Sequence, residues 1–239
     1  MPLPEARAIT IIWSNIPAEH TEAIRKWHNL EHTTERLEGP GYIALHRYNR
    51  EGGDGHHGRL NIFEGLDLAT FDNPYYLESR NNPTPWTRES MRLIKDAERS
   101  VCTLEAACGG PPRIEPPYLY SVRFGFADKE TDLIAWFKEE HLPRLCGLEG
   151  VMRGRLFRRE IKLSALETEE TRIHKMKTAA PWSFVSLYEL STIAPLGTDA
   201  WREAATGTPR SAGMVEKLIQ PVRESWWLDF AKYAPRVLA

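Results

Sequence analysis

Two histidines of the segment HNLEHTTER have the spacing and side-chain type to carry chemistry. His28 and His32 lie four positions apart, so a helix would place both on one face. Neutral imidazoles at this spacing can bind zinc if a third ligand is near. A histidine in a cleft can instead move a proton without a cofactor, because its ordinary pKa lies close to neutrality. A structural role, in which the side chain bonds the helix to a neighbouring loop, is the third interpretation.

A second set of candidates lies in the segment YIALHRYN at 42–49. Strict alternation would place Tyr42, His46 and Tyr48 on one face of a strand. Such a face combines aromatic surface with hydrogen-bonding groups, which suits an aromatic or polyketide-like ligand. The alternative is that both tyrosines are core residues whose hydroxyls are satisfied locally.

Prolines and aromatic residues are concentrated in NPYY at 73–76 and in NNPTPW at 81–86. Prolines fix the backbone and aromatic rings provide rigid contact surface, so this cluster is suited to form a lid or wall over a cleft. Tyr75 and Trp86 would then touch the substrate. The alternative is that the cluster only interrupts helices and packs them.

These features together define a predicted site in the first half of the chain. We predict that His32 acts as general acid or base and that His28 and His46 assist it. The predicted substrate-binding residues are Tyr42, Tyr48, Tyr75, Trp86 and Glu31. Neither a metal ion nor an organic cofactor is predicted.

An internal repeat indicates how these residues are positioned. WHNLEH at 27–32 recurs as WFKEEH at 136–141, 109 positions later. LNIFE at 60–64 then matches VSLYE at 185–189, which is 125 positions later. The second copy therefore carries an insertion of 16 residues, which falls within 160–180. Because that stretch is polar and charged, we predict a surface hairpin extension.

Each copy has the pattern strand, helix, two strands, helix, strand, which is the ferredoxin-like β-α-β-β-α-β module. We predict a first half at 1–108, a second half at 118–239, and a Pro- and Gly-rich linker at 109–117. The helices of a module cover only one face of its sheet, so the bare face must be buried. The predicted fold is therefore α+β, a tandem duplication of the module that closes into an intrachain dimeric α/β barrel.

The WHNLEH pattern, followed by Pro40-Gly41-Tyr42 and a strand with Arg47-Tyr48, resembles EthD-like and related dimeric α/β-barrel proteins. This superfamily includes cofactor-free cyclases, decarboxylases, dehydratases, isomerases and monooxygenases, as well as haem proteins and proteins without known activity. The resemblance places the family histidine on His32, with His141 as its degenerate copy. It covers residues 8–108 and, more weakly, 118–231.

The second copy departs from the family pattern at several positions. Glu149-Gly150-Val151 replaces Pro-Gly-Tyr, and Phe137 stands where the first copy has His28. There is also no histidine at the position equivalent to His46. We therefore expect the working pocket in the first half, with the second half mainly as scaffold.

Composition excludes several classes of protein. Thirty-one basic and 33 acidic side chains give a net charge of −2, which argues against partners such as nucleic acid or an anionic membrane. The three cysteines have no CxxC spacing, and no run of 18 apolar residues occurs. No signal peptide is evident at the N-terminus. We expect a cytoplasmic protein, and exposed sheet edges would favour a homodimer.

The predicted function is that of a cofactor-independent enzyme for a small-molecule substrate. The reaction would be of the lyase, cyclase or isomerase type, with histidine-mediated proton transfer on an aromatic or polyketide-like carbonyl compound. One alternative is a cofactor-free or metal-assisted monooxygenase. Another is a protein without catalytic activity that binds a ligand or serves as a scaffold.

Overall fold

Eight antiparallel strands close into one barrel in the order β1-β3-β2-β8-β5-β7-β6-β4, which confirms the predicted fold class. The computed structural model describes residues 4–112, 114–177 and 179–235. The strands are β1 (Ala8–Asn15), β2 (Tyr42–Gly53), β3 (Arg59–Gly65), β4 (Lys95–Cys108), β5 (Tyr118–Phe126), β6 (Val151–Arg159), β7 (Phe184–Leu190) and β8 (Leu218–Tyr233).

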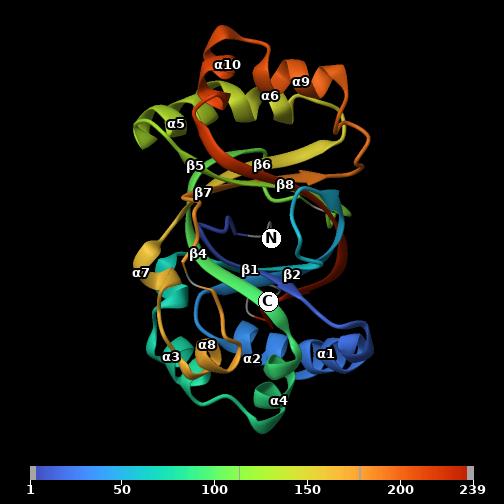
Figure 1. Ribbon diagram of the computed structural model, residues 1–239, viewed down its shortest axis with the longest axis vertical. Coiled ribbons are helices and arrows are strands. Elements are labelled where there is room, and N and C mark those ends of the chain that lie inside the picture. Colours follow the sequence, from blue (N-terminus) through green and yellow to red (C-terminus); the bar gives the residue numbers. More distant parts are fainter. Residues whose placement is uncertain (1–3, 113, 178, 236–239) are drawn as a thin grey trace.

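Two layers of helices cover opposite ends of the molecule, with the barrel between them (Figure 1). One layer contains α1 (Thr21–Trp27), η2 (His28–His32), α2 (Thr33–Glu38), α3 (Pro74–Asn81) and α4 (Pro85–Leu93). The other contains α5 (Glu130–Trp136), η4 (Phe137–His141), α6 (Leu142–Cys146), α9 (Asp199–Thr206) and α10 (Pro209–Val215). Short 3₁₀ turns, η1 (Ala18–His20) and η3 (Leu68–Phe71), complete the first half.

Alternation along the strands separates the barrel interior from the two helical layers. On β1, Ile9, Ile11 and Trp13 point into the barrel, while Thr10 and Ile12 face the helices. The interior core draws on both halves of the chain, including Tyr48, Leu60, Leu119, Phe157, Val185, Leu187 and Trp226. The bare faces of the two sheets therefore bury each other, as the amphipathic pattern predicts.

Two seams join the halves, because β2 pairs with β8 and β4 pairs with β6. The barrel is closed, so the described strands leave no unpaired sheet edge. Exposed sheet edges are what would favour a homodimer, and the described strands offer none.

The insertion at 160–180 is not the exposed hairpin that its polarity suggests. It contains α7 (Ile161–Ser164) and α8 (Glu169–Ile173), and α8 lies against the helical layer of the first half (Figure 1). Ser164, Glu170 and His174 are buried. Arginines of the first half neutralise Glu170, so this polar segment can pack without leaving a lone buried charge.

None of the described helices is both long and apolar enough to cross a lipid bilayer.

Candidate functional site

The Trp and Glu of the WHNLEH motif hold two helices together. The indole Nε1 of Trp27 donates to Thr87 Oγ1 of α4 over 3.1 Å. Glu31 accepts hydrogen bonds from Thr84 at 2.6 Å and from Thr87 at 3.0 Å. Thr84 is the N-cap of α4, so the motif fixes where that helix begins.

The second half repeats these contacts on α10. Trp136 Nε1 donates to Ser211 Oγ over 3.0 Å, and Glu140 accepts from the hydroxyls of Ser211 and of Thr208, the N-cap of α10. Both motifs end in a five-residue π-helical turn, η2 and η4, which places His32 and His141 at its last position. Such turns are rare and occur often at functional sites.

Glu31→Ala should therefore lower the free energy of unfolding by about 1–2 kcal/mol, because two hydroxyls lose their acceptor. Urea unfolding at pH 7 measures this loss. The exposed Glu19→Ala is the matched control and should leave stability unchanged. A loss of no more than that of the control would show that the carboxylate is dispensable for helix packing.

A small cavity lies between the first-half helices and the outer face of β1, β2 and β3. Its volume is about 60 Å³. His28, His32 and Tyr42 line it, together with Glu170 and His174 from the insertion. The structure therefore brings three of the predicted site residues together and adds two from the other half of the chain.

His28 and His32 are both buried, and their ring centroids lie 5.6 Å apart. Arg47 Nη1 donates to His28 Nδ1 at 3.2 Å, which places the proton of neutral His28 on Nε2. Burial, with a contribution from Arg47, lowers the pKa of His28 well below its usual value. Burial also lowers the pKa of His32, helped by the charge of Arg36. Both imidazoles are neutral near pH 7.

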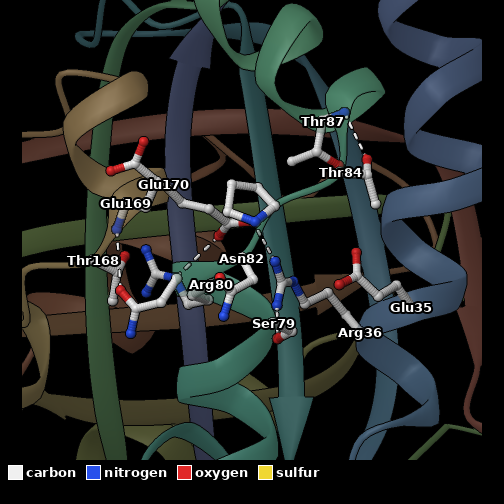
Figure 2. Close-up of polar contacts among 12 residues, drawn as sticks. Glu35, Arg36, Ser79, Arg80, Asn82, Thr84, Thr87, Thr168, Glu169 and Glu170 are labelled. Carbon is white, nitrogen blue, oxygen red and sulfur yellow. Dashed lines mark hydrogen bonds and ion pairs between the residues drawn. The ribbon is translucent and has the colours of Figure 1, made fainter.

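Helix α8 covers one side of this cavity. Glu170 pairs with Arg36, and it accepts a hydrogen bond from Arg80 Nε at 3.1 Å (Figure 2). Beside it, Glu169 pairs with Arg88 of α4 at 2.7 Å. The second half of the chain thus provides the roof of the first-half cavity.

The prediction that Tyr42, His46 and Tyr48 share one face is wrong. The register of β2 against β3 shifts between Tyr42 and Ala44, and such a bulge reverses the alternation of side chains. Tyr42 faces the helices and lines the first-half cavity, whereas Tyr48 belongs to the core inside the barrel. His46 points into one end of the barrel, where its Nε2 lies 3.0 Å from Glu115.

That end of the barrel holds a buried charge cluster. Arg155 bonds Glu64 at 2.7 Å and Glu189 at 2.5 Å, and all three side chains are buried. Burial alone would raise the pKa of Glu64, but the charges of Arg155 and His46 hold it at about 2. The cluster is an ion-paired part of the core, and it lies on the other side of the sheet from His32.

The remaining predicted substrate-binding residues lie outside the first-half cavity. Tyr75 is partly exposed, and its hydroxyl donates to the Glu35 carbonyl at 2.9 Å. Trp86 packs with the cluster around Ile24 and Trp27, and Glu31 serves the helix contacts described above. The packing alternative for the proline-rich cluster therefore accounts for Tyr75 and Trp86 in this structure.

A much larger pocket lies at the equivalent place in the second half, between β5, β7 and β8 and the helices above them. Its volume is about 660 Å³. Its lining is mostly aromatic and aliphatic, with Tyr120, Phe124, Trp136, Phe137, Tyr188 and Trp201 among the residues. A volume of roughly 300–1,000 Å³ and an apolar lining with few polar groups are typical of small-molecule sites.

Among the polar residues of this pocket, which include Arg202 and Arg223, His141 and Tyr188 form a hydrogen-bonded pair. His141 Nε2 lies 2.8 Å from the Tyr188 hydroxyl. Burial lowers the pKa of His141 to about 4 and raises that of Tyr188, so both side chains are neutral near pH 7. In the first half, Phe63 faces His32 where Tyr188 faces His141, so only the second half has this hydrogen bond.

The β2–β3 hairpin of the first half contributes to the wall of the second-half pocket through Gly53. Gly53 has a φ of +106°, and a Cβ there would collide with the Arg223 carbonyl oxygen. Each half therefore lines part of the other's pocket: Gly53 lies in the wall of the second-half pocket, and Glu170 lies in the lining of the first-half cavity.

Zinc binding by His28 and His32 would require a third protein ligand. Over 4–112, 114–177 and 179–235, no three His, Cys, Asp or Glu side chains come together in a way that could hold a metal ion.

Sequence reasoning missed Tyr188, Tyr120 and Trp201 as pocket residues. The repeat offset of 125 aligns Tyr188 with Phe63, so a hydroxyl present in only one copy was the available signal. Trp201 stands edge-on to both tyrosines, at 5.6 Å from each ring centroid. Strand alternation could have grouped Tyr120 with Val122 and Phe124 on the helix-facing side of β5.

Comparison with sequences finds no match, either among models of known protein families or among curated proteins.

Solved structures show the same fold at low sequence identity. An anthrone oxidase-like protein matches with a TM-score of 0.60 and 12% identity, over 98% of this chain and 95% of its own. A proposed monooxygenase from Lactobacillus acidophilus NCFM matches with a TM-score of 0.56 and 10% identity, over 96% and 97%. A mutant chlorite dismutase from Candidatus Nitrospira defluvii matches with a TM-score of 0.52 and 10% identity, over 98% and 94%. These matches establish the dimeric α/β-barrel fold.

Proposed function

We propose that the protein is a small-molecule enzyme that binds an aromatic or polyketide-like carbonyl compound in the second-half pocket. The observation that carries this proposal is an aromatic pocket of about 660 Å³ around the His141–Tyr188 pair. The volumes favour the second half for such a ligand, because the first-half cavity of about 60 Å³ is too small for an aromatic ring system. His32 thus keeps no role toward a large ligand in this proposal.

The chemistry follows from the geometry of the pair. When its hydroxyl turns from His141 to a bound ligand, Tyr188 can donate a hydrogen bond to the ligand carbonyl oxygen, which leaves Nε2 of neutral His141 free to act as a base. His141 then takes the proton from the carbon that enolises, Tyr188 stabilises the enolate oxygen that forms, and the imidazolium returns a proton to the ligand carbon or oxygen. The apolar walls exclude water and strengthen this interaction with developing charge. Enolisation of the ligand is the proton transfer that lyase, cyclase and isomerase reactions of this kind share.

Exchange of ligand α-protons in D₂O, followed by NMR, tests the proposal without knowledge of the final product. We expect the protein to catalyse exchange at the α-carbon C2 of 1-tetralone, and at C10 of anthrone, whose protons are acidified by the carbonyl through the aromatic rings. Tyr188→Phe should reduce the exchange rate by about 10²–10⁴-fold, while the dissociation constant changes by less than about threefold.

Two further variants make the result specific. Ala205→Trp should abolish binding, because Ala205 lines the pocket and the larger ring would fill it. His32→Gln alters the equivalent first-half position and should leave exchange unchanged. Exchange that survives Tyr188→Phe, or that is lost only in His32→Gln, would contradict the assignment. Binding without exchange would favour a ligand carrier.

A cofactor-free oxygenase is the second candidate, which the names of the structural neighbours favour. The anthrone oxidase-like protein and the proposed monooxygenase have the same fold. Here the enolised ligand would react with dioxygen after the proton transfer at His141–Tyr188. Oxygen consumption that depends on ligand and on Tyr188 distinguishes this reaction from isomerisation or ring closure.

We further propose that the halves 1–108 and 118–239 are duplicated EthD-like modules. The repeated Trp and Glu contacts to α4 and α10 support this, because each pair involves equivalent atoms and equivalent helix caps. The equivalent positions of η2 and η4 support it as well.

A further inference from the structure

The first-half cavity is lined by polar residues whose buried atoms have no partners. Neither ring nitrogen of His174 has a hydrogen-bond partner, and the side chain is only 8% exposed. His32 Nδ1, Thr10 Oγ1 and Asn61 Oδ1 are also buried without partners, and all four residues line the cavity. Buried polar groups are almost always satisfied, so this cluster indicates that something polar belongs in the cavity.

The charges around the cavity do not balance. Arg36, Arg80 and Arg99 line it and are at most 4% exposed, while Glu170 is the lining carboxylate. Glu35 lies near Arg36, outside the lining, and counting it still leaves one positive charge in excess. A buried charge without a counterion is costly, so the site favours a negative group.

The excess positive charge affects the pKa of the Tyr76 hydroxyl. Its hydroxyl oxygen accepts from Arg80 at 2.7 Å and from Arg99 at 2.5 Å. Burial alone would raise its pKa, but the three arginines lower it. At Tyr76 the charges of these arginines therefore outweigh the effect of burial on the pKa.

We propose that the first-half cavity binds a small anion with a planar carboxylate or a similar oxyanion, held between the arginines and His174. A volume of about 60 Å³ has room for roughly four water-sized groups, which matches formate, acetate or nitrate. Guanidinium groups are well suited to such planar anions. This site is separate from the His141–Tyr188 pocket and does not depend on the function proposed for it.

We expect helix α8, which lies along one side of the cavity, to slow exchange of the anion. The cavity is roofed by Glu170, which pairs with both Arg36 and Arg80. An anion that enters on the α8 side must pass Glu170 and its two ion pairs. Binding should therefore be slower than diffusion-limited association.

The test is a melting-temperature titration of the whole protein with sodium formate, acetate and nitrate. Sodium gluconate, which is too large for the cavity, replaces them to hold ionic strength constant. We expect a saturable rise of about 5 °C or more at saturating acetate, and no rise with neutral acetamide. A crystal grown in acetate should show the anion beside Arg80 and His174.

Two variants should shift the affinity in opposite directions. Arg80→Met should weaken acetate binding by at least about tenfold, because one counterion and its hydrogen bonds are lost. Glu170→Gln keeps the shape of the roof but removes its negative charge, so it should tighten binding by about tenfold. Arg210→Met, at an exposed surface ion pair, is the matched control and should leave affinity unchanged.

The proposal is overturned if no probe gives a saturable shift in the unaltered protein. It is also overturned if Arg80→Met and Glu170→Gln both behave like Arg210→Met. Should Arg80→Met fail to fold, the opposite shift in Glu170→Gln and the crystal structure in acetate decide the question, and an acetate-free cavity in that crystal would refute the site.

Discussion

Arg155→Met is expected to lower the free energy of unfolding at pH 7 by about 3–5 kcal/mol, because it strands two buried carboxylates. Glu64 and Glu189 both bond Arg155, and each is less than a tenth exposed. Arg153 is the nearest replacement, but it lies 3.7 Å from Glu189 and also pairs with Glu5. Urea unfolding monitored by tryptophan fluorescence measures the change.

The loss of unfolding free energy in Arg155→Met should depend on pH, and the direction of that dependence follows from the pKa of Glu64. Glu64 has a folded pKa of about 2 because of Arg155, so its contribution is present above pH 4.5 and is lost as pH falls toward 2. Without Arg155, the buried carboxylate takes up a proton at higher pH. The difference in unfolding free energy between the variant and the unaltered protein should therefore narrow as pH falls, starting above about pH 4.5, where the variant's carboxylate takes up its proton.

The control is the combined variant Glu64→Gln, Arg155→Met, Glu189→Gln, in which no charge of the triad remains. It should recover most of the lost stability, since replacing a whole buried ion cluster is far less costly than breaking it. Equal losses in the single and the combined variant would show that packing, and not charge, is responsible.

Acidification is expected to unfold the protein near pH 5. Burial lowers the pKa of His141 and of His57 to about 4 and that of His174 to about 3, and it lowers those of His28 and His32 as well. The unfolded chain takes up these protons as pH falls through about 6.5, while the folded protein does not until much lower pH. Folding stability should therefore fall by about 6 kcal/mol per pH unit between pH 6 and 5.

The pKa of His46 is shifted in the opposite direction, so its effect on stability appears at higher pH. Burial lowers its pKa, but the hydrogen bond to Glu115 and the charge of Glu64 outweigh burial and raise it. Its contribution is full below about pH 6.5 and is lost only as pH rises through the folded value. It therefore does not offset the acid-induced loss.

Unfolding free energies at half-unit steps from pH 7 to 5 give the number of protons taken up. His174→Gln should reduce the slope by about one proton, or 1.4 kcal/mol per pH unit. Stability that is level from pH 7 to 5 would mean that water or an anion reaches these histidines in the folded state.

Much of the fold could be predicted because its signals are local and repeated. The alternation of Ile9, Ile11 and Trp13 identifies the face of β1 that enters the barrel. The recurrence of WHNLEH as WFKEEH indicates two modules with the same helix contacts. The first residues of β4 are mostly charged and those of β8 include Gln220 and Pro221, so periodicity does not indicate where either strand begins.

The site was harder to predict because it depends on tertiary features. A one-residue bulge after Tyr42 separates it from His46 and Tyr48, and no residue type in the segment indicates the bulge. The insertion looks solvated in sequence, because the arginines that neutralise Glu170 lie about 90 and 134 positions away. Pocket volume depends on how side chains of several elements pack, which spacing along the chain does not reveal.

Each half contributes residues to the pocket of the other, and this affects how such a chain can diverge in evolution. Gly53 shapes the pocket of the second half, and Glu170 closes the cavity of the first. Selection on one pocket therefore acts on the coding sequence of the other half, so neither half can be exchanged, duplicated or lost without altering both. Substitutions that adapt the second-half pocket to a new ligand are to be sought in the β2–β3 hairpin as well as beside His141.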